Sequence, residues 1–147
     1  IAGGVALSGR SLIRAAPVAG VALYKGAQVL EQLSRTEKDR AANKREIAAV
    51  TKALSDERFA RGFGSMGGEE FFSYLNISDS LQRTGGKEWE SWNGKIKNQL
   101  VGLQNQDGTW AGHHCITGRV AVTSAALLTL LADQEVAGSA AANPSEG

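Results

Sequence analysis

The segment LVGLQNQDGTW, residues 100–110, constrains the fold of this chain more than any other. Asp107-Gly108 is a turn dipeptide, because glycine accepts a positive φ and an aspartate side chain can bond to its own backbone. Trp110 then has the reach to pack back on the end of a preceding helix. Gln104 can bond to the backbone groups that two neighbouring helix ends leave unsatisfied. We therefore predict a structural clasp between two helices, formed by Gln104, Gly108 and Trp110.

Helical periodicity predicts a helix on each side of this clasp. Residues 87–104 form an amphipathic helix whose apolar face consists of Trp89, Trp92, Ile96, Leu100 and Leu103. Residues 118–132 are apolar on nearly every side, with valine, alanine and leucine at most positions. A helix of that kind must be buried all round. We therefore expect residues 118–132 to be the most buried helix of the protein.

The clasp resembles a known repeat motif. Its spacing, Leu-x3-Gln-x3-Gly-x-Trp, is similar to the QW motif of the prenyltransferase and squalene/hopene cyclase-like repeat family, whose members stack helical hairpins into an α/α toroid. The similarity extends at lower specificity through residues 67–100 and 116–133, and so covers roughly the second half of the chain. The resemblance implies an all-α fold of stacked helical hairpins, forming a partial α/α toroid because this length supplies too few hairpins for a ring.

The chain is expected to hold one helical domain with two extensions. Residues 1–16 are an N-terminal extension, residues 17–133 are the helical α/α-toroid-like domain, and residues 134–147 are a small, polar tail expected to be disordered. The first residue is Ile1 and not methionine, and a toroid of this family normally needs more hairpins than this length supplies, so the resemblance implies that the chain is a piece of a longer protein.

Three further segments of the domain have recognisable patterns. Residues 17–34 are expected to be helical. Residues 36–54 are expected to form one long, charged and exposed helix that packs on one side only and begins with a capping box of Thr36 and Asp39. The glycine-rich segment 60–68 is interpreted as a loop before a helix that starts at Glu69 and ends at a glycine pair.

Composition excludes several classes of partner. The 16 basic and 15 acidic residues give a net charge of +1, so there is no electrostatic case for a nucleic-acid partner. No apolar run approaches the roughly 18 to 20 residues that span a bilayer, so we expect no transmembrane segment. The single cysteine excludes an internal disulfide.

Reactive side chains gather just before the apolar helix of residues 118–132. His113, His114 and Cys115 lie next to the positive end of that helix, and Arg119 adds a fixed charge. Adjacent side chains diverge, and zinc ligand pairs are usually separated by two or more residues, so we expect no metal site. A nucleophilic Cys115 paired with a histidine is an alternative. A capping, packing or weak ligand-contact role is the favoured interpretation.

A ligand or partner surface is expected where the amino-terminal ends of two helices meet, near Glu69 and Gly118. Its polar groups are Glu69, Glu70, His113, His114, Cys115 and Arg119. They lie beside an apolar wall of Phe71, Trp110 and Ile116, and ligand pockets combine such groups. Acidic residues in a first helical turn also stabilise the helix dipole, which explains Glu69 and Glu70 without a site.

The catalytic signatures that the family resemblance implies are missing. The sequence contains no DxDD acid, no DDxxD magnesium motif, no GCGEQ thioester motif and no spaced Asp, Cys and His set. We therefore expect a non-catalytic helical binding or scaffold module that needs no cofactor and acts within a larger assembly. Its partner would be a protein or an apolar small molecule. The alternatives are a terpenoid cyclase or prenyltransferase-type fragment, a Cys-His hydrolase, or a structural subunit whose residues 36–54 lie along a neighbour.

Overall fold

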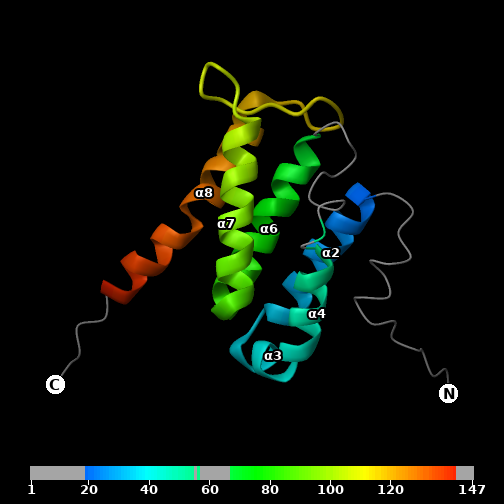
Figure 1. The fold of residues 1–147 in the computed structure, drawn as a ribbon, viewed down its shortest axis with the longest axis vertical. Coiled ribbons are helices and arrows are strands. Elements are labelled where there is room, and N and C mark those ends of the chain that lie inside the picture. The colour runs from blue at the N-terminus through cyan, green and yellow to red at the C-terminus, as the bar shows by residue number, and fades with distance from the viewer. Residues whose placement is uncertain (1–18, 55, 57–66, 142–147) are drawn as a thin grey trace.

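The protein is all-α. The computed structural model describes residues 19–54, 56 and 67–141, and these contain helices and loops but no strand. Figure 1 shows the helices packed side by side, with the loop between the last two helices at one end. In chain order the helices are α2 (Ala19–Ser34), α3 (Glu37–Ala42), α4 (Lys44–Leu54), α6 (Gly68–Thr84), α7 (Gly86–Leu103) and α8 (Arg119–Ala141).

Helix α6 is the centre of the described structure. It packs against α2, α7 and α8 (Figure 1). Its inward face is fully buried and consists of Phe71, Tyr74, Ile77 and Leu81, which recur at the spacing of helical turns. The helix ends at Thr84, and the predicted glycine pair follows: Gly85 and Gly86, whose φ angles are 68° and 78°, turn the chain back into α7.

Two side-chain hydrogen bonds fix α7 on α6. The Trp92 indole donates to the Ser78 hydroxyl at 2.8 Å, and the Gln99 amide donates to the Tyr74 hydroxyl at 2.9 Å. Both the indole and the phenol are buried aromatic groups that need a polar partner. The α6–α7 pair is therefore a rigid hairpin that holds the loop at its end.

Helix α8 is not the most buried helix, and that prediction was wrong. It buries Val122, Ala125, Ala126 and Thr129, but exposes Val120, Leu127, Leu128 and Leu131, whose exposed fractions are 84%, 46%, 49% and 50%. Among the described helices, α8 packs against α6 and α7, which together cover one side of it. Periodicity identified an apolar helix but carried no information on how many neighbours surround it.

Helix α8 also continues further than expected. It runs to Ala141, so residues 134–141, which were expected to belong to the tail, continue the helix. Small residues such as the alanines of this segment are good helix formers and can extend a helix that has already begun. Residues 142–147 lie outside the described residues, as do the predicted N-terminal extension, residues 1–16, and most of the glycine-rich segment 60–68.

The charged segment 36–54 forms two helices rather than one. The predicted capping box is present, because the Thr36 hydroxyl accepts from the Asp39 backbone N–H at 3.1 Å and the Asp39 carboxylate accepts from the Thr36 backbone N–H. The break falls at Asn43, whose side chain donates to the Leu33 carbonyl at 3.4 Å. Helix α3 buries no residue, whereas α4 buries one stripe that includes Ile47. The expected one-sided packing is therefore confirmed for α4.

None of the described helices combines the length and the apolar character that crossing a bilayer requires.

Candidate functional site

The loop between α7 and α8 begins with the predicted clasp. Trp110 is 2% exposed, and its indole donates to the Leu100 carbonyl near the end of α7 at 2.8 Å. Its backbone N–H donates to the Thr123 hydroxyl of α8 at 3.0 Å, and this hydroxyl donates to the Trp110 carbonyl at 3.0 Å. One tryptophan is thus bonded to both helices, and it holds the loop in place at this end of the molecule.

A tight turn precedes the tryptophan. The Gln104 amide donates to the Gly108 carbonyl at 2.8 Å, and Gly108 has a φ of 81°, which favours glycine. The Asp107 carboxylate accepts from both the backbone N–H and the hydroxyl of Thr109, and these bonds, with the Arg119 guanidinium at 2.5 Å, hold the pKa of Asp107 below its usual value. Arg119 therefore pairs with the clasp rather than with the predicted site.

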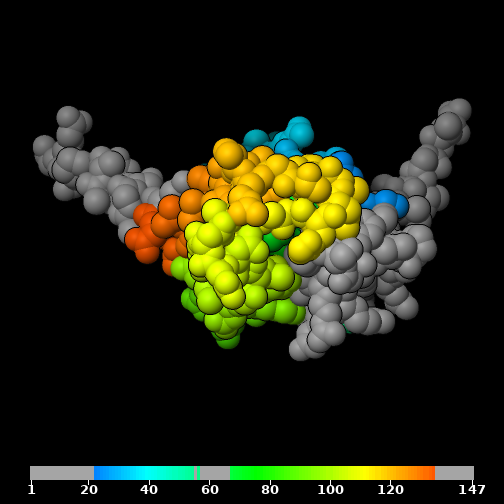
Figure 2. Space-filling model, turned by 90° about the horizontal axis from the view of Figure 1, so that it is seen from above, coloured from blue at the N-terminus to red at the C-terminus, as the bar shows by residue number. Residues whose placement is uncertain are grey.

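The rest of the loop crosses this end of the molecule and reaches the start of α6. Figure 2 shows the segment between α7 and α8, in yellow, spread across this end. The loop approaches the α6 backbone closely: a Cβ atom on Gly112 would lie 2.0 Å from the Ile116 carbonyl oxygen and 2.5 Å from the Gly68 nitrogen. A Cβ on Gly68 would lie 2.2 Å from the same oxygen. Glycine at both positions is what allows the loop to lie against the amino-terminal end of α6.

This close approach brings three reactive side chains together. The Glu69 carboxylate oxygen Oε1 lies 3.1 Å from Nδ1 of His114, and the Cys115 sulfur lies 3.4 Å from that same nitrogen. The three ligand-type atoms all lie within 4.8 Å of one another. We call Glu69, His114 and Cys115 the EHC cluster. Glu69 and His114 are half-buried, whereas Cys115 is exposed.

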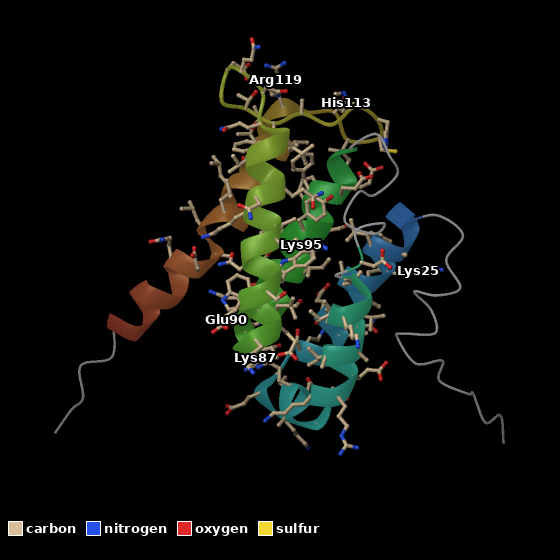
Figure 3. The ribbon with its side chains drawn as sticks, in the orientation of Figure 1. Lys25, Lys87, Glu90, Lys95, His113 and Arg119 are labelled. Carbon is tan, nitrogen blue, oxygen red and sulfur yellow. The ribbon has the colours of Figure 1, made fainter. Side chains whose placement is uncertain are left out.

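The remaining predicted site residues lie apart from the EHC cluster. His113 is exposed and does not belong to the cluster. Figure 3 shows Arg119 at the start of α8 and His113 in the loop that precedes it. Glu70 is fully buried and faces Tyr74, whose hydroxyl pKa is raised, first by burial and then by the Glu70 carboxylate. The predicted surface is therefore divided between the clasp, the core and the EHC cluster.

The EHC cluster lacks the geometry of a nucleophilic cysteine. A Cys-His-Glu relay needs the thiol on one ring nitrogen and the carboxylate on the other, so that the ring passes a proton between them. Here the sulfur and the carboxylate both lie against Nδ1 of His114. The pKa of the Cys115 thiol is also raised, first by its hydrogen bond with Glu69 and then by burial, which opposes thiolate formation. Hydrolysis through Cys115 is therefore disfavoured.

A second surface feature lies on α8. Its exposed face carries Val120, Ser124, Leu127, Leu128 and Leu131, none of which is charged. Beside Leu128 a groove of about 300 Å³ lies between residues of α8 and α6. The residues that line this groove are Leu75, Asn76, Asp79, Gln82, Leu128 and Ala132. Sequence reasoning placed this apolar face in the core, and the residues themselves gave no sign that one side would be left open.

Comparison with known proteins does not assign the chain to a family. No protein-family model, no curated protein and no solved structure matches it.

Proposed function

We propose that this chain is a non-catalytic helical interaction module, and that the uncharged face of α8 packs against the same face of a second copy within an assembly. The single observation that carries the proposal is the exposed apolar side of α8, where Val120 is 84% and Leu131 is 50% exposed. Contiguous apolar surface of this kind marks an interaction site in a protein that folds in water. The family resemblance supports a scaffold of prenyltransferase and squalene-cyclase-like repeats, with the hydrogen bonds of Trp110 in the role of the QW clasp.

The spacing of the exposed residues favours a second copy of α8 as the occupant. Val120, Ser124, Leu127 and Leu131 are separated by four, three and four residues, which places them on one helical stripe. This spacing reads the same in both directions. An antiparallel copy therefore sets Val120 opposite Leu131 and the small Ser124 opposite the larger Leu127, so that a large side chain meets a small one.

The size of the stripe sets the strength of the contact. Burying the exposed half of a leucine or valine contributes about 1 kcal/mol, so Val120, Leu127 and Leu131 of the stripe, with Leu128 beside it, contribute roughly 8 kcal/mol in a symmetrical pair of copies. Association itself costs about 4 to 15 kcal/mol. At the low end of that cost about 4 kcal/mol remains, which corresponds to a dissociation constant of about 1 mM, so the degree of assembly is expected to rise with protein concentration.

Sedimentation equilibrium tests the proposal over roughly 20 µM to 2 mM, a range that includes millimolar association. We expect the dimer fraction of the parent chain to rise steeply within it. Ser124→Glu removes no apolar surface and places a charge at the centre of the stripe, so it should keep the chain monomeric. Leu131→Glu should do the same.

The matched control is Val101→Glu, which changes an exposed apolar residue on α7 that is 64% exposed and lies outside the stripe. It should dimerise like the parent chain. A parent that stays monomeric throughout the range overturns the proposal, as does a Ser124→Glu variant that dimerises normally. Equal loss of dimer in Val101→Glu would place the contact elsewhere and would also contradict it.

A further inference from the structure

Two of the three ligand-atom separations in the EHC cluster match the edges of a tetrahedral zinc site, and the third is no longer than 4.8 Å. Zinc stands about 2.0 Å from nitrogen and oxygen ligands and about 2.3 Å from sulfur, so tetrahedral ligands are about 3.3 Å apart for nitrogen and oxygen and about 3.5 Å apart for nitrogen and sulfur. The corresponding separations here are 3.1 Å between Glu69 Oε1 and His114 Nδ1, and 3.4 Å between His114 Nδ1 and the Cys115 sulfur. Both lie within about 0.2 Å of those edges.

Each of the three side chains has a lone pair that a divalent cation accepts. Without a cation, the Cys115 thiol bonds to the Glu69 carboxylate, and Nδ1 of His114 lies within hydrogen-bond distance of the same carboxylate. A cation between the three atoms would instead accept a lone pair from each. The second carboxylate oxygen of Glu69, Oε2, is buried and has no hydrogen-bond partner. An unpaired buried oxygen is costly, and a cation beside this carboxylate would offset that cost.

The backbone explains how neighbouring residues can both be ligands. The sequence predicts no metal site at His113, His114 and Cys115, because the side chains of adjacent residues diverge. Cys115 has a φ of 55°, the left-handed conformation that a residue with a side chain rarely adopts. In this conformation the Cys115 sulfur lies beside Nδ1 of His114. The third potential ligand is Glu69 rather than His113.

We propose that Glu69, His114 and Cys115 bind a single Zn²⁺ ion. Sulfur, imidazole nitrogen and carboxylate oxygen form a mixed ligand set that suits zinc rather than magnesium or calcium. Because Cys115 is exposed, the fourth position faces solvent and takes a water or the donor atom of a ligand. Binding deprotonates the Cys115 thiol and releases that proton to solvent.

The ion would fasten the loop between α7 and α8 to the first turn of α6. Glu69 belongs to α6, whereas His114 and Cys115 belong to the loop, so the three ligands join segments that are far apart in the sequence. Gly67 makes room for the cluster, because a Cβ there would lie 2.4 Å from Glu69 Oε2 and 2.5 Å from His114 Cε1. The site uses no residue of the exposed α8 stripe, so zinc binding and dimerisation are tested independently of each other.

Cobalt substitution tests the site directly in the parent chain. Co²⁺ titrated into metal-free protein should produce a thiolate-to-cobalt charge-transfer band and the strong visible bands of tetrahedral cobalt, saturating at one equivalent. Zn²⁺ should displace it and abolish both signals. Elemental analysis of protein purified without added metal should find one zinc per chain. Absence of the thiolate band in the parent overturns the proposal whatever the variants show.

The variants distinguish the proposed ligands from their neighbours. Glu69→Gln, His114→Ala and Cys115→Ser should each weaken Zn²⁺ binding more than about tenfold, since even the groups that orient metal ligands cost 10- to 100-fold when removed. His113→Ala is the matched control and should bind zinc like the parent chain. Loss of zinc in His113→Ala, or full affinity in Glu69→Gln, would mean a different ligand set and would contradict the proposal. Far-UV circular dichroism of each metal-free variant checks that its helices remain.

Discussion

Trp110 is the residue whose removal should damage this fold most. Its side chain is 2% exposed and fills the space between the end of α7 and the start of α8. Cutting a buried tryptophan to alanine costs about 3 to 5 kcal/mol, from lost burial and the cavity left behind. The Leu100 carbonyl loses its indole donor as well. We therefore expect Trp110→Ala to lower the free energy of unfolding by at least about 4 kcal/mol, a large share of the total for a domain of this size.

Urea denaturation followed by circular dichroism measures this loss. With a slope of about 2 kcal/mol per molar urea, a loss of 4 kcal/mol lowers the midpoint by about 2 M. Trp110→Phe keeps an aromatic ring but lacks the indole N–H, and should cost about 1 to 3 kcal/mol. Trp89→Ala is the matched control, because Trp89 is only half-buried on α7 and should cost less than Trp110. An unchanged midpoint in Trp110→Ala, or an equal loss in Trp89→Ala, would refute the clasp.

Three smaller predictions follow from local geometry. Gly112→Ala places a Cβ 2.0 Å from the Ile116 carbonyl oxygen, so it should both lower the thermal midpoint and weaken Zn²⁺ binding. A variant as stable as the parent chain would show that the loop does not lie on α6. Gly94→Ala adds a methyl group in open space within α7 and should raise stability by about 0.5 to 1 kcal/mol in urea denaturation, whereas a decrease would contradict the helical geometry. The hydrogen bond from Lys97 lowers the pKa of the Asp133 carboxyl below its value in the unfolded chain. The pair therefore stabilises the fold above about pH 4, and this contribution is lost as the pH falls through the lower pKa of the folded state. Asp133→Asn should therefore cost under about 1 kcal/mol at pH 7 and nothing near pH 2, and an equal cost at both would exclude the ion pair.

The cluster shows where sequence reasoning stopped. His114 and Cys115 were recognised as reactive, but their partner Glu69 lies 45 residues earlier and was explained by the helix dipole alone. The signals that connect them are Gly68 and Gly112, whose missing side chains let two backbones touch. A glycine in a sequence is consistent with a close contact at its α-carbon, but it does not identify the atom on the other side of that contact.

The sequence by itself determined the features that depend on neighbouring residues. The turn at Gly108, the reach of Trp110 to the helix before it, the capping box at Thr36 and the period of the apolar residues in α6 all follow from local geometry. Each depends on contacts within about one turn or one loop of the chain, where the covalent structure limits the arrangements available. The all-α class follows from the same periodicity.

Only the tertiary structure decided which surfaces are covered. Leu127 and Val122 are equally apolar in the sequence, yet Val122 is buried and Leu127 is 46% exposed, because α6 and α7 lie on one side of α8. The tertiary structure also decided that Glu69 lies near Cys115, because the loop lies over the start of α6. Burial and long-range contact are properties of how helices pack, and packing is set by the whole set of neighbours rather than by the pattern of any one helix.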